Sequence, residues 1–352
     1  MIWIASPKVG YEEMKNVMDV IRSGMLVQGK KVEEFENEFS KKIGARYSIA
    51  CSSGTAALYM AFLSLGIGTG DEVITTPFTF VATINMIKVV GAIPVFVDIK
   101  DNYNINEELI EAAITDKTKA IVPVHMFGNP CNMNVIMKIA DKYKLKVIED
   151  CAQSYGAKYN EHYVGVGSDI GCFSFYPSKI MTTGEGGMCV TDDNEIAKKL
   201  RYLRNHGMEG SSYDYKCLGF NYKMTDIAAA IGLVQLSKVD RFILTRRDIA
   251  RSFNFFLDDI IDVPQTESYG MHVYNNYSFN VKNRDLFILN MKANGIDCRV
   301  YYPKSFADLP KVSKICKEVV SIPIRPNLTD DEINHIVCNV RETIKNETNN
   351  PT

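Results

Sequence analysis

Short apolar runs alternate with helical stretches through the middle of this 352-residue chain, and this alternation constrains its fold more than any other feature. Four of the runs have the character of buried strands: residues 72–76, 93–97, 120–124 and 147–148. Helical stretches occur between them, including residues 106–114 and 135–144. Strands that alternate with helices predict an α/β fold, in which helices cover both faces of a mostly parallel sheet.

The sequence before this region predicts two helices, a strand and a third helix. Apolar residues recur at helical spacing over residues 14–21 and 32–43, and a glycine closes each segment. A short strand at residues 47–50 then leads into a helix from residue 54 to about 65.

The character of the sequence changes after Asp240. The following segments predict, in order, a basic helix, two regions of short strands and a final helix: residues 241–256, 272–281, 297–302 and 330–344. We therefore expect a large domain over residues 1–240 and a smaller α+β domain over residues 241–352, with the N-terminal segment packed against the smaller one.

Composition argues against several classes of protein. The net charge is −2 and no block of like charges occurs, which disfavours nucleic acid or a membrane surface as the main partner. No apolar run approaches the roughly 20 residues of a membrane helix, and the first residues lack the apolar core of a signal peptide. Nine dispersed cysteines and five histidines form no metal-binding spacing. We expect reduced thiols, a cytoplasmic location and no metal site.

Two glycine-containing segments could bind phosphate. Ser53-Gly54-Thr55 offers backbone N–H groups and hydroxyls where a helix begins, which suits a phosphate group, although serine and threonine also cap many ordinary helices. The glycine-rich segment 66–71 superficially resembles a nucleotide-binding loop. It precedes a strand instead of opening a helix, so we interpret it as a plain turn.

A lysine and an aspartate suggest the chemistry. Asp150 follows the apolar residues 147–148, and Lys179 follows the aromatic segment 173–176. Pyridoxal phosphate (PLP) chemistry needs a lysine that holds the aldehyde as a Schiff base and an aspartate that keeps the pyridine nitrogen protonated. Each residue alone could equally be a surface charge, but together they predict a PLP site. Glu149 points away from Asp150 if the strand is extended, so only one of the two can face that site.

Two other side chains have both a functional and a structural interpretation. Phe80 follows the strand that ends at Thr76 and could stack on a flat cofactor ring, or it could pack in the core. His125 ends another apolar strand, and we interpret it as a core histidine rather than a residue that lines the site.

These motifs occur in an order that resembles the DegT/DnrJ/StrS family of sugar aminotransferases, which are PLP enzymes of fold type I. The resemblance extends over about residues 7–340. The matching segments are residues 52–58, 70–74, 79–83, 148–153, 173–175, 184–187 and 219–222, together with Lys179.

The resemblance implies a role for each site residue. It implies that Lys179 carries the Schiff base and moves the proton between substrate and cofactor, and that Asp150, not Glu149, pairs with the pyridine nitrogen. Gln153 contacts the ring hydroxyl and Phe80 stacks on the ring in this interpretation. The residues expected at the phosphate are Gly54, Thr55, Ser174 and, from a neighbouring subunit, Asn221. The resemblance therefore also implies a homodimer with shared active sites.

The reaction that the resemblance implies is transfer of an amino group, with glutamate as donor, to a nucleotide-linked keto-sugar. One alternative is a sugar dehydratase, although such relatives carry histidine where Lys179 stands. A second is another PLP enzyme of this fold, acting on a free amino acid or a cyclitol ketone, and a third is a regulatory or binding protein without catalysis. Lys223 replaces an arginine common in the family, and the segment after Tyr302-Pro303 is shortened, so the sugar and the nucleotide stay open.

Overall fold

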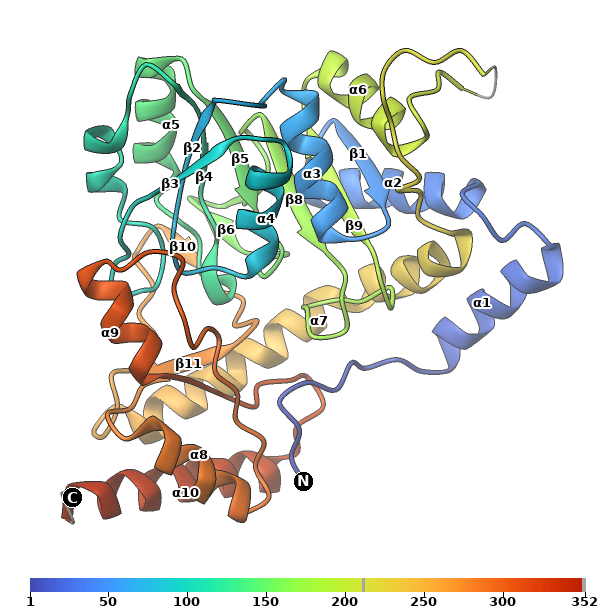
Figure 1. The fold of residues 1–352 in the computed structure, drawn as a ribbon. Coiled ribbons are helices and arrows are strands. Elements are labelled where there is room, and N and C mark those ends of the chain that lie inside the picture. Colours follow the sequence, from blue (N-terminus) through green and yellow to red (C-terminus); the bar gives the residue numbers. More distant parts are fainter. Residues whose placement is uncertain (211–212, 350–352) are drawn as a thin grey trace.

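The computed structural model describes residues 1–210 and 213–349, and the last three residues of the predicted smaller domain lie outside these ranges. A seven-stranded sheet with the order β1-β9-β8-β5-β4-β2-β3 forms its centre (Figure 1). Its strands are β1 (Tyr47–Cys51), β2 (Glu72–Thr75), β3 (Ile93–Phe96), β4 (Thr118–Val122), β5 (Lys146–Asp150), β8 (Ile170–Ser174) and β9 (Gly187–Thr191). Only β9 runs antiparallel to its neighbours, which confirms the predicted mostly parallel sheet.

Helices cover both faces of this sheet. One face packs on α2 (Lys30–Ile43), α5 (Met133–Tyr143) and α7 (Asp226–Leu257). The other face packs on α3 (Gly54–Ser64), α4 (Val81–Val89) and α6 (Asn194–Arg204). Neighbouring residues such as Val147 and Ile148 belong to opposite cores, because successive side chains of a strand point to opposite faces. Strands covered on both sides must be apolar throughout, and this is the pattern the sequence shows.

The first helices end where glycine allows a left-handed backbone. α1 (Tyr11–Ser23) is followed by Gly24 at φ 73°, and α2 by Gly44 at φ 77°, as predicted. The segment 66–71 is a turn before β2, also as predicted, in which Gly68 N–H donates to the Asp71 carboxylate at 2.9 Å. Figure 1 shows α1 at the outer edge of the molecule, beside one end of α7.

A second hydrophobic core lies in the C-terminal part of the chain. It is built from the antiparallel pair β11 (Tyr277–Asn280) and β12 (Val319–Ile322), the end of α7, α8 (Arg284–Ala293) and α10 (Asp330–Asn349). The N-terminus joins this part, since Ile2 forms a bridge with Ile296. The long helix α7 runs without interruption through the proposed boundary after Asp240, so the two parts share one helix.

Smaller elements connect these two parts. A second helix of the C-terminal region, α9 (Pro310–Glu318), lies against the central domain, and its first turn is capped by the Asp98 carboxylate. A small sheet joins β10 (Gly270–Met271), β6 (Lys158–Tyr159) and β7 (His162–Tyr163), and η3 (Met126–Gly128) follows β4.

Two local predictions were wrong. Residues 106–114 form two short 3₁₀ turns, η1 (Glu107–Leu109) and η2 (Glu111–Ala113), instead of one helix. Glu107 is buried and binds Lys100 and Asn132, so tertiary contacts override the local helical pattern. The predicted strand at residues 297–302 is reduced to one bridge, between Arg299 and Ser321, because the chain then leaves β12 and carries Tyr302 toward β5.

Among the described residues, none of the helices combines the length and the apolar character that crossing a bilayer requires. All nine cysteines carry free thiols, and seven of them are buried.

Candidate active site

The residues predicted from the sequence gather where the central strands end. Asp150 is the last residue of β5 and Ser174 the last of β8, while Gly54 opens the helix after β1. Lys179 lies in the connection from β8 to β9. A pocket opens beside Lys179 between the N-terminal segment, α7 and the C-terminal region; its lining includes Ser6, Thr182, Gln235, Asn276 and Tyr301.

Two hydrogen bonds fix the Asp150 carboxylate. Thr83 Oγ1 donates to Oδ2 at 2.8 Å, and the Ala152 N–H donates to Oδ1 at 3.0 Å. Thr79 Oγ1 lies 3.0 Å from Thr83 Oγ1 and extends this chain of hydroxyls. Neither threonine was predicted as a site residue, although they are four residues apart, with Thr79 just before α4 and Thr83 in its first turn. These hydrogen bonds orient the carboxylate, as the partner of a ring nitrogen must be.

Lys179 is half-buried and feels the charge of Asp150. Burial lowers the pKa of its ammonium group from 10.5 to about 8, although the negative charge of Asp150 acts in the opposite direction. A lysine with such a pKa is partly neutral near neutral pH and can act as a nucleophile and a proton carrier. The two residues predicted to carry the chemistry therefore lie near each other.

Gln153 is held between a backbone turn and a tyrosine. Its Oε1 accepts the Phe127 N–H at 3.0 Å, and its Nε2 donates to Tyr302 Oη at 3.1 Å. The Tyr302 ring also lies 6.1 Å from the ring of Phe80, which is 54% exposed. Burial, and then the charge of Asp150, raises the pKa of Tyr302. The contact of Tyr302 with Gln153 was not predicted from the sequence, where Tyr302-Pro303 served only to locate the shortened segment that follows it.

The turn at the start of α3 has the shape of a phosphate cradle. Ser53 Oγ accepts the Ala56 N–H at 3.1 Å, so the turn is capped, while the N–H groups of Gly54 and Thr55 precede the first helical hydrogen bonds. A Cβ atom on Gly54 would lie 2.7 Å from Ser174 Cβ, so only glycine allows this close approach. Gly54, Thr55 and Ser174 thus fit a phosphate group, and the lysine and aspartate fit the ring of PLP.

Asn221 lies on the surface of the single chain. Its neighbour Tyr222 accepts the Ser52 N–H at 2.9 Å, so this segment runs beside the cradle. Within the described part of the chain, no side-chain hydrogen bond joins Asn221 to the other predicted site residues. The next residue but one, Lys223, donates to Asn205 Oδ1 at 2.9 Å.

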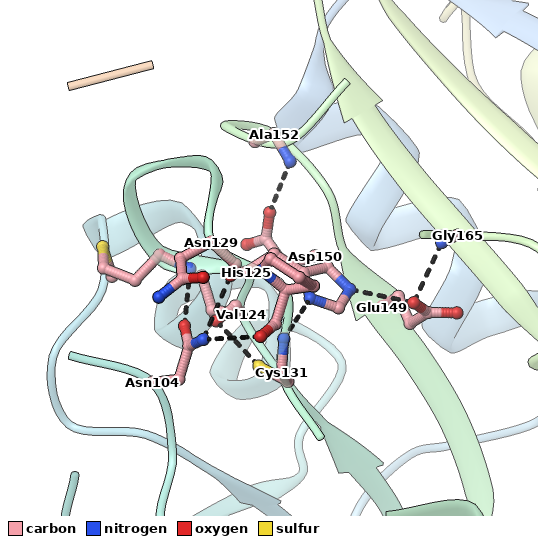
Figure 2. A network of polar contacts seen from close by, with 11 residues as sticks. Asn104, Val124, His125, Asn129, Cys131, Glu149, Asp150, Ala152 and Gly165 are labelled. Atoms are coloured by element: carbon pink, nitrogen blue, oxygen red, sulfur yellow. Dashed lines mark hydrogen bonds and ion pairs between the residues drawn. The ribbon is translucent and has the colours of Figure 1, made fainter. Parts of the chain in front are cut away.

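His125 is a core histidine, as interpreted from the sequence. It is fully buried, and both of its ring nitrogens have partners (Figure 2). Nδ1 accepts the Cys131 N–H at 3.0 Å, so the proton is on Nε2, which donates to Glu149 Oε2 at 2.8 Å. His125, Glu149 and Cys151 lie close together and are residue types that can bind a metal ion. However, Nε2 of His125 carries the ring proton, so it has no lone pair available for a metal.

The chain is similar to known aminotransferases over almost all of its length. The model of the DegT/DnrJ/EryC1/StrS aminotransferase family matches residues 7–341. GDP-perosamine synthase of Caulobacter vibrioides is 35% identical, with 96% of each chain covered. UDP-N-acetyl-3-dehydro-alpha-D-glucosamine 3-aminotransferase of Acidithiobacillus ferrooxidans is 37% identical, with 95% of this chain and 94% of that protein covered.

A solved structure has the same fold. DesV of S. venezuelae, in complex with a ketimine intermediate, superposes with a TM-score of 0.92 at 32% identity, with 94% of each chain covered. These findings confirm the predicted fold, an enzyme of the aminotransferase class and PLP as its cofactor. The chain belongs to the DegT/DnrJ/EryC1/StrS aminotransferase family.

Proposed function

We propose that this enzyme transfers an amino group from glutamate to a nucleotide-linked keto-sugar. The observation that carries the proposal is the pair formed by Lys179, whose pKa is lowered to about 8, and the fixed carboxylate of Asp150. Relatives that act on GDP- and UDP-linked sugars support the choice of acceptor. The exact sugar depends on surroundings that differ here, including Lys223 and the short segment after Pro303.

The residues of this chain divide the work of such a reaction. PLP, when bound, supplies the electron sink. The neutral Lys179 amine takes the proton from the α-carbon of the donor and returns it to the acceptor carbon. Asp150 keeps the ring nitrogen charged, while Gln153 and Phe80 position the ring. Gly54, Thr55 and Ser174 hold the phosphate through the cradle at the start of α3.

A homodimer completes the site in our proposal. The helix α1 leaves Met14, Met18 and Ile21 exposed, and Met25 and Val27 continue this apolar surface. Apolar surface of this extent on one edge of a molecule is typical of a subunit interface. We propose that Asn221 of the second copy contacts the cradle of the first in this dimer. Replacing Met18 and Ile21 by glutamate should yield monomers in light scattering, with weaker PLP binding.

The cytoplasm is the compartment we propose. Nine free thiols, seven of them buried, are stable where the redox poise keeps cysteines reduced.

The decisive experiment is a screen of keto-sugars linked to UDP, dTDP or GDP, each incubated with the PLP-loaded protein and glutamate. We expect an aminated sugar and 2-oxoglutarate in equal amounts, and none with Lys179→Ala. Amination of a cyclitol ketone alone would favour the other PLP activity. A colourless protein that PLP leaves unchanged would favour a binding protein and contradict the proposal.

A further inference from the structure

The carboxylate next to Asp150 in the sequence lies on the other face of β5, in a closed polar network (Figure 2). Glu149 is 2% exposed, and its Oε2 accepts hydrogen bonds from His125 Nε2 and from the Gly165 N–H at 2.9 Å. A buried carboxylate is stable only when such donors satisfy it. Glu149 accepts a hydrogen bond from the Nε2–H group and so favours the ring tautomer with its proton on Nε2. In that tautomer His125 Nδ1 is free to accept the hydrogen bond from the Cys131 N–H.

His125 therefore closes a turn whose backbone is strained. Phe127 has a φ angle of 58°, which a residue other than glycine rarely adopts, so the strain lies there. Gly128 follows with a φ angle of 93°. The bond from the Cys131 N–H to His125 ties the two ends of this turn together. Asn104 holds its middle: the side-chain oxygen accepts the Met126 N–H at 2.9 Å, and the amide donates to the Asn129 carbonyl at 3.0 Å (Figure 2).

The turn contacts the active site through backbone N–H groups, and one of them, the His125 N–H, donates to the Asp150 carbonyl at 3.2 Å. The Phe127 N–H donates to Gln153 Oε1, and this bond decides which end of the amide faces the turn. Nε2 is then directed to the other side, toward Tyr302 Oη. A primary amide has two N–H donors on Nε2 and only acceptors on Oε1, so the turn makes Gln153 a donor toward the site. If the side-chain amide of Gln153 were flipped by about 180°, it would present its acceptor Oε1 toward the site instead.

We propose that the His125–Glu149 pair is a positioning pair for the reaction: it holds the turn at residues 124–131 so that Gln153 presents its N–H groups to the ring hydroxyl of PLP. This inference rests on the proposed function, because that ring hydroxyl is the group Gln153 would meet. A donor stabilises the deprotonated hydroxyl, whereas an acceptor would destabilise it. The two side chains hydrogen-bond each other, the Cys131 N–H of the turn and the Gly165 N–H, so the proposed effect on Gln153 passes through the turn.

The test follows the visible absorbance of the PLP-loaded protein as a function of pH. The quantity compared is the midpoint, the pH at which half of the absorbance change has occurred. Gln153→Ala removes the donor, and its absorbance midpoint should rise by about 0.5–1 pH unit. His125→Gln should raise the midpoint in the same direction, and the double variant should shift no further than Gln153→Ala alone, because both changes remove the same contact. Glu149→Gln keeps an acceptor for Nε2 and should stay near the wild type, whereas Glu149→Leu should behave like His125→Gln.

The matched control is His162→Gln, because His162 is an exposed histidine of β7 outside this network. Its midpoint should equal that of the wild type. An unchanged midpoint in His125→Gln, or a shift that adds in full to that of Gln153→Ala, would overturn the inference while leaving the proposed function intact. Wild-type protein without any PLP band would contradict the proposed function and this inference together.

A measurement on the wild type protects the test against variants that do not fold. With ¹⁵N-labelled histidine, NMR of the PLP-loaded protein should show the ring proton of His125 on Nε2. The Nδ1–H tautomer would overturn the inference without any substitution.

Discussion

The two faces at the end of β5 carry neighbouring carboxylates with opposite surroundings. Glu149 lies in a sealed network whose donors are a histidine ring and a backbone N–H. Asp150 is also buried, but its charge acts on Lys179, which lines a pocket. The same side-chain chemistry thus serves structure on one face and reactivity on the other. What separates them is not burial but the neighbouring ionisable group: His125 is fully buried, whereas Lys179 lines the pocket.

The largest effect is expected from removing that partner. Lys179→Ala should lower kcat by about 10³-fold, because no other described side chain at this edge can replace the amine that moves the proton. The cradle of Gly54, Thr55 and Ser174 is untouched, so the variant should still bind part of its PLP. Single-turnover absorbance measurements with glutamate check both statements. Turnover within tenfold of the wild type would rule out the assignment of Lys179.

Substituting each carboxylate in turn tests the comparison directly. Asp150→Asn should lower kcat by about 100-fold, since a neutral amide cannot keep the ring nitrogen protonated. Glu149→Gln makes the same chemical change on the other face and should lower kcat less than about fivefold, because a hydrogen-bond acceptor is retained. Steady-state kinetics on both variants decide the matter. Equal losses would mean that the two faces do not differ in function.

The pH dependence of PLP capture sharpens the comparison further. Only the neutral amine attacks the aldehyde, and the pKa of Lys179 is lowered to about 8. The capture rate of PLP-free protein should therefore rise about tenfold per pH unit up to pH 8 and then level off. Stopped-flow absorbance between pH 6 and 10 measures it, with Nα-acetyl-lysine as the reference amine. A rate that still climbs steeply at pH 10, like that of the reference, would place Lys179 in water.

The contrast between the two faces also marks what the sequence could predict. The sheet, both helix layers and the order of the site residues followed from apolar periodicity and local motifs, and the opposite directions of Glu149 and Asp150 followed from strand geometry. Contacts between distant segments did not follow. Tyr302 reaches Gln153 from 149 positions away in the sequence, and Glu107 is buried through contacts with Lys100 and Asn132. No local pattern encodes such partners, because tertiary packing selects them.

A smaller effect than that of Asp150→Asn is expected one contact away from the chemistry, at Thr83. Thr83→Val keeps the shape of the side chain but removes the 2.8 Å hydrogen bond to Asp150 Oδ2. A hydrogen bond to a charged group contributes about 1.5–3 kcal/mol, and only part of it should appear in the rate, because the Ala152 N–H still holds Oδ1. We expect kcat to fall about five- to tenfold.

Thr79→Val is the matched control for this variant. Thr79 contacts Thr83 and makes no hydrogen bond with Asp150 among the described contacts, so its loss should change kcat no more than about twofold. If Thr83→Val is as active as Thr79→Val, then Asp150 is oriented by its backbone bond alone. In that case the difference between the two faces of β5 would reduce to the position of Lys179.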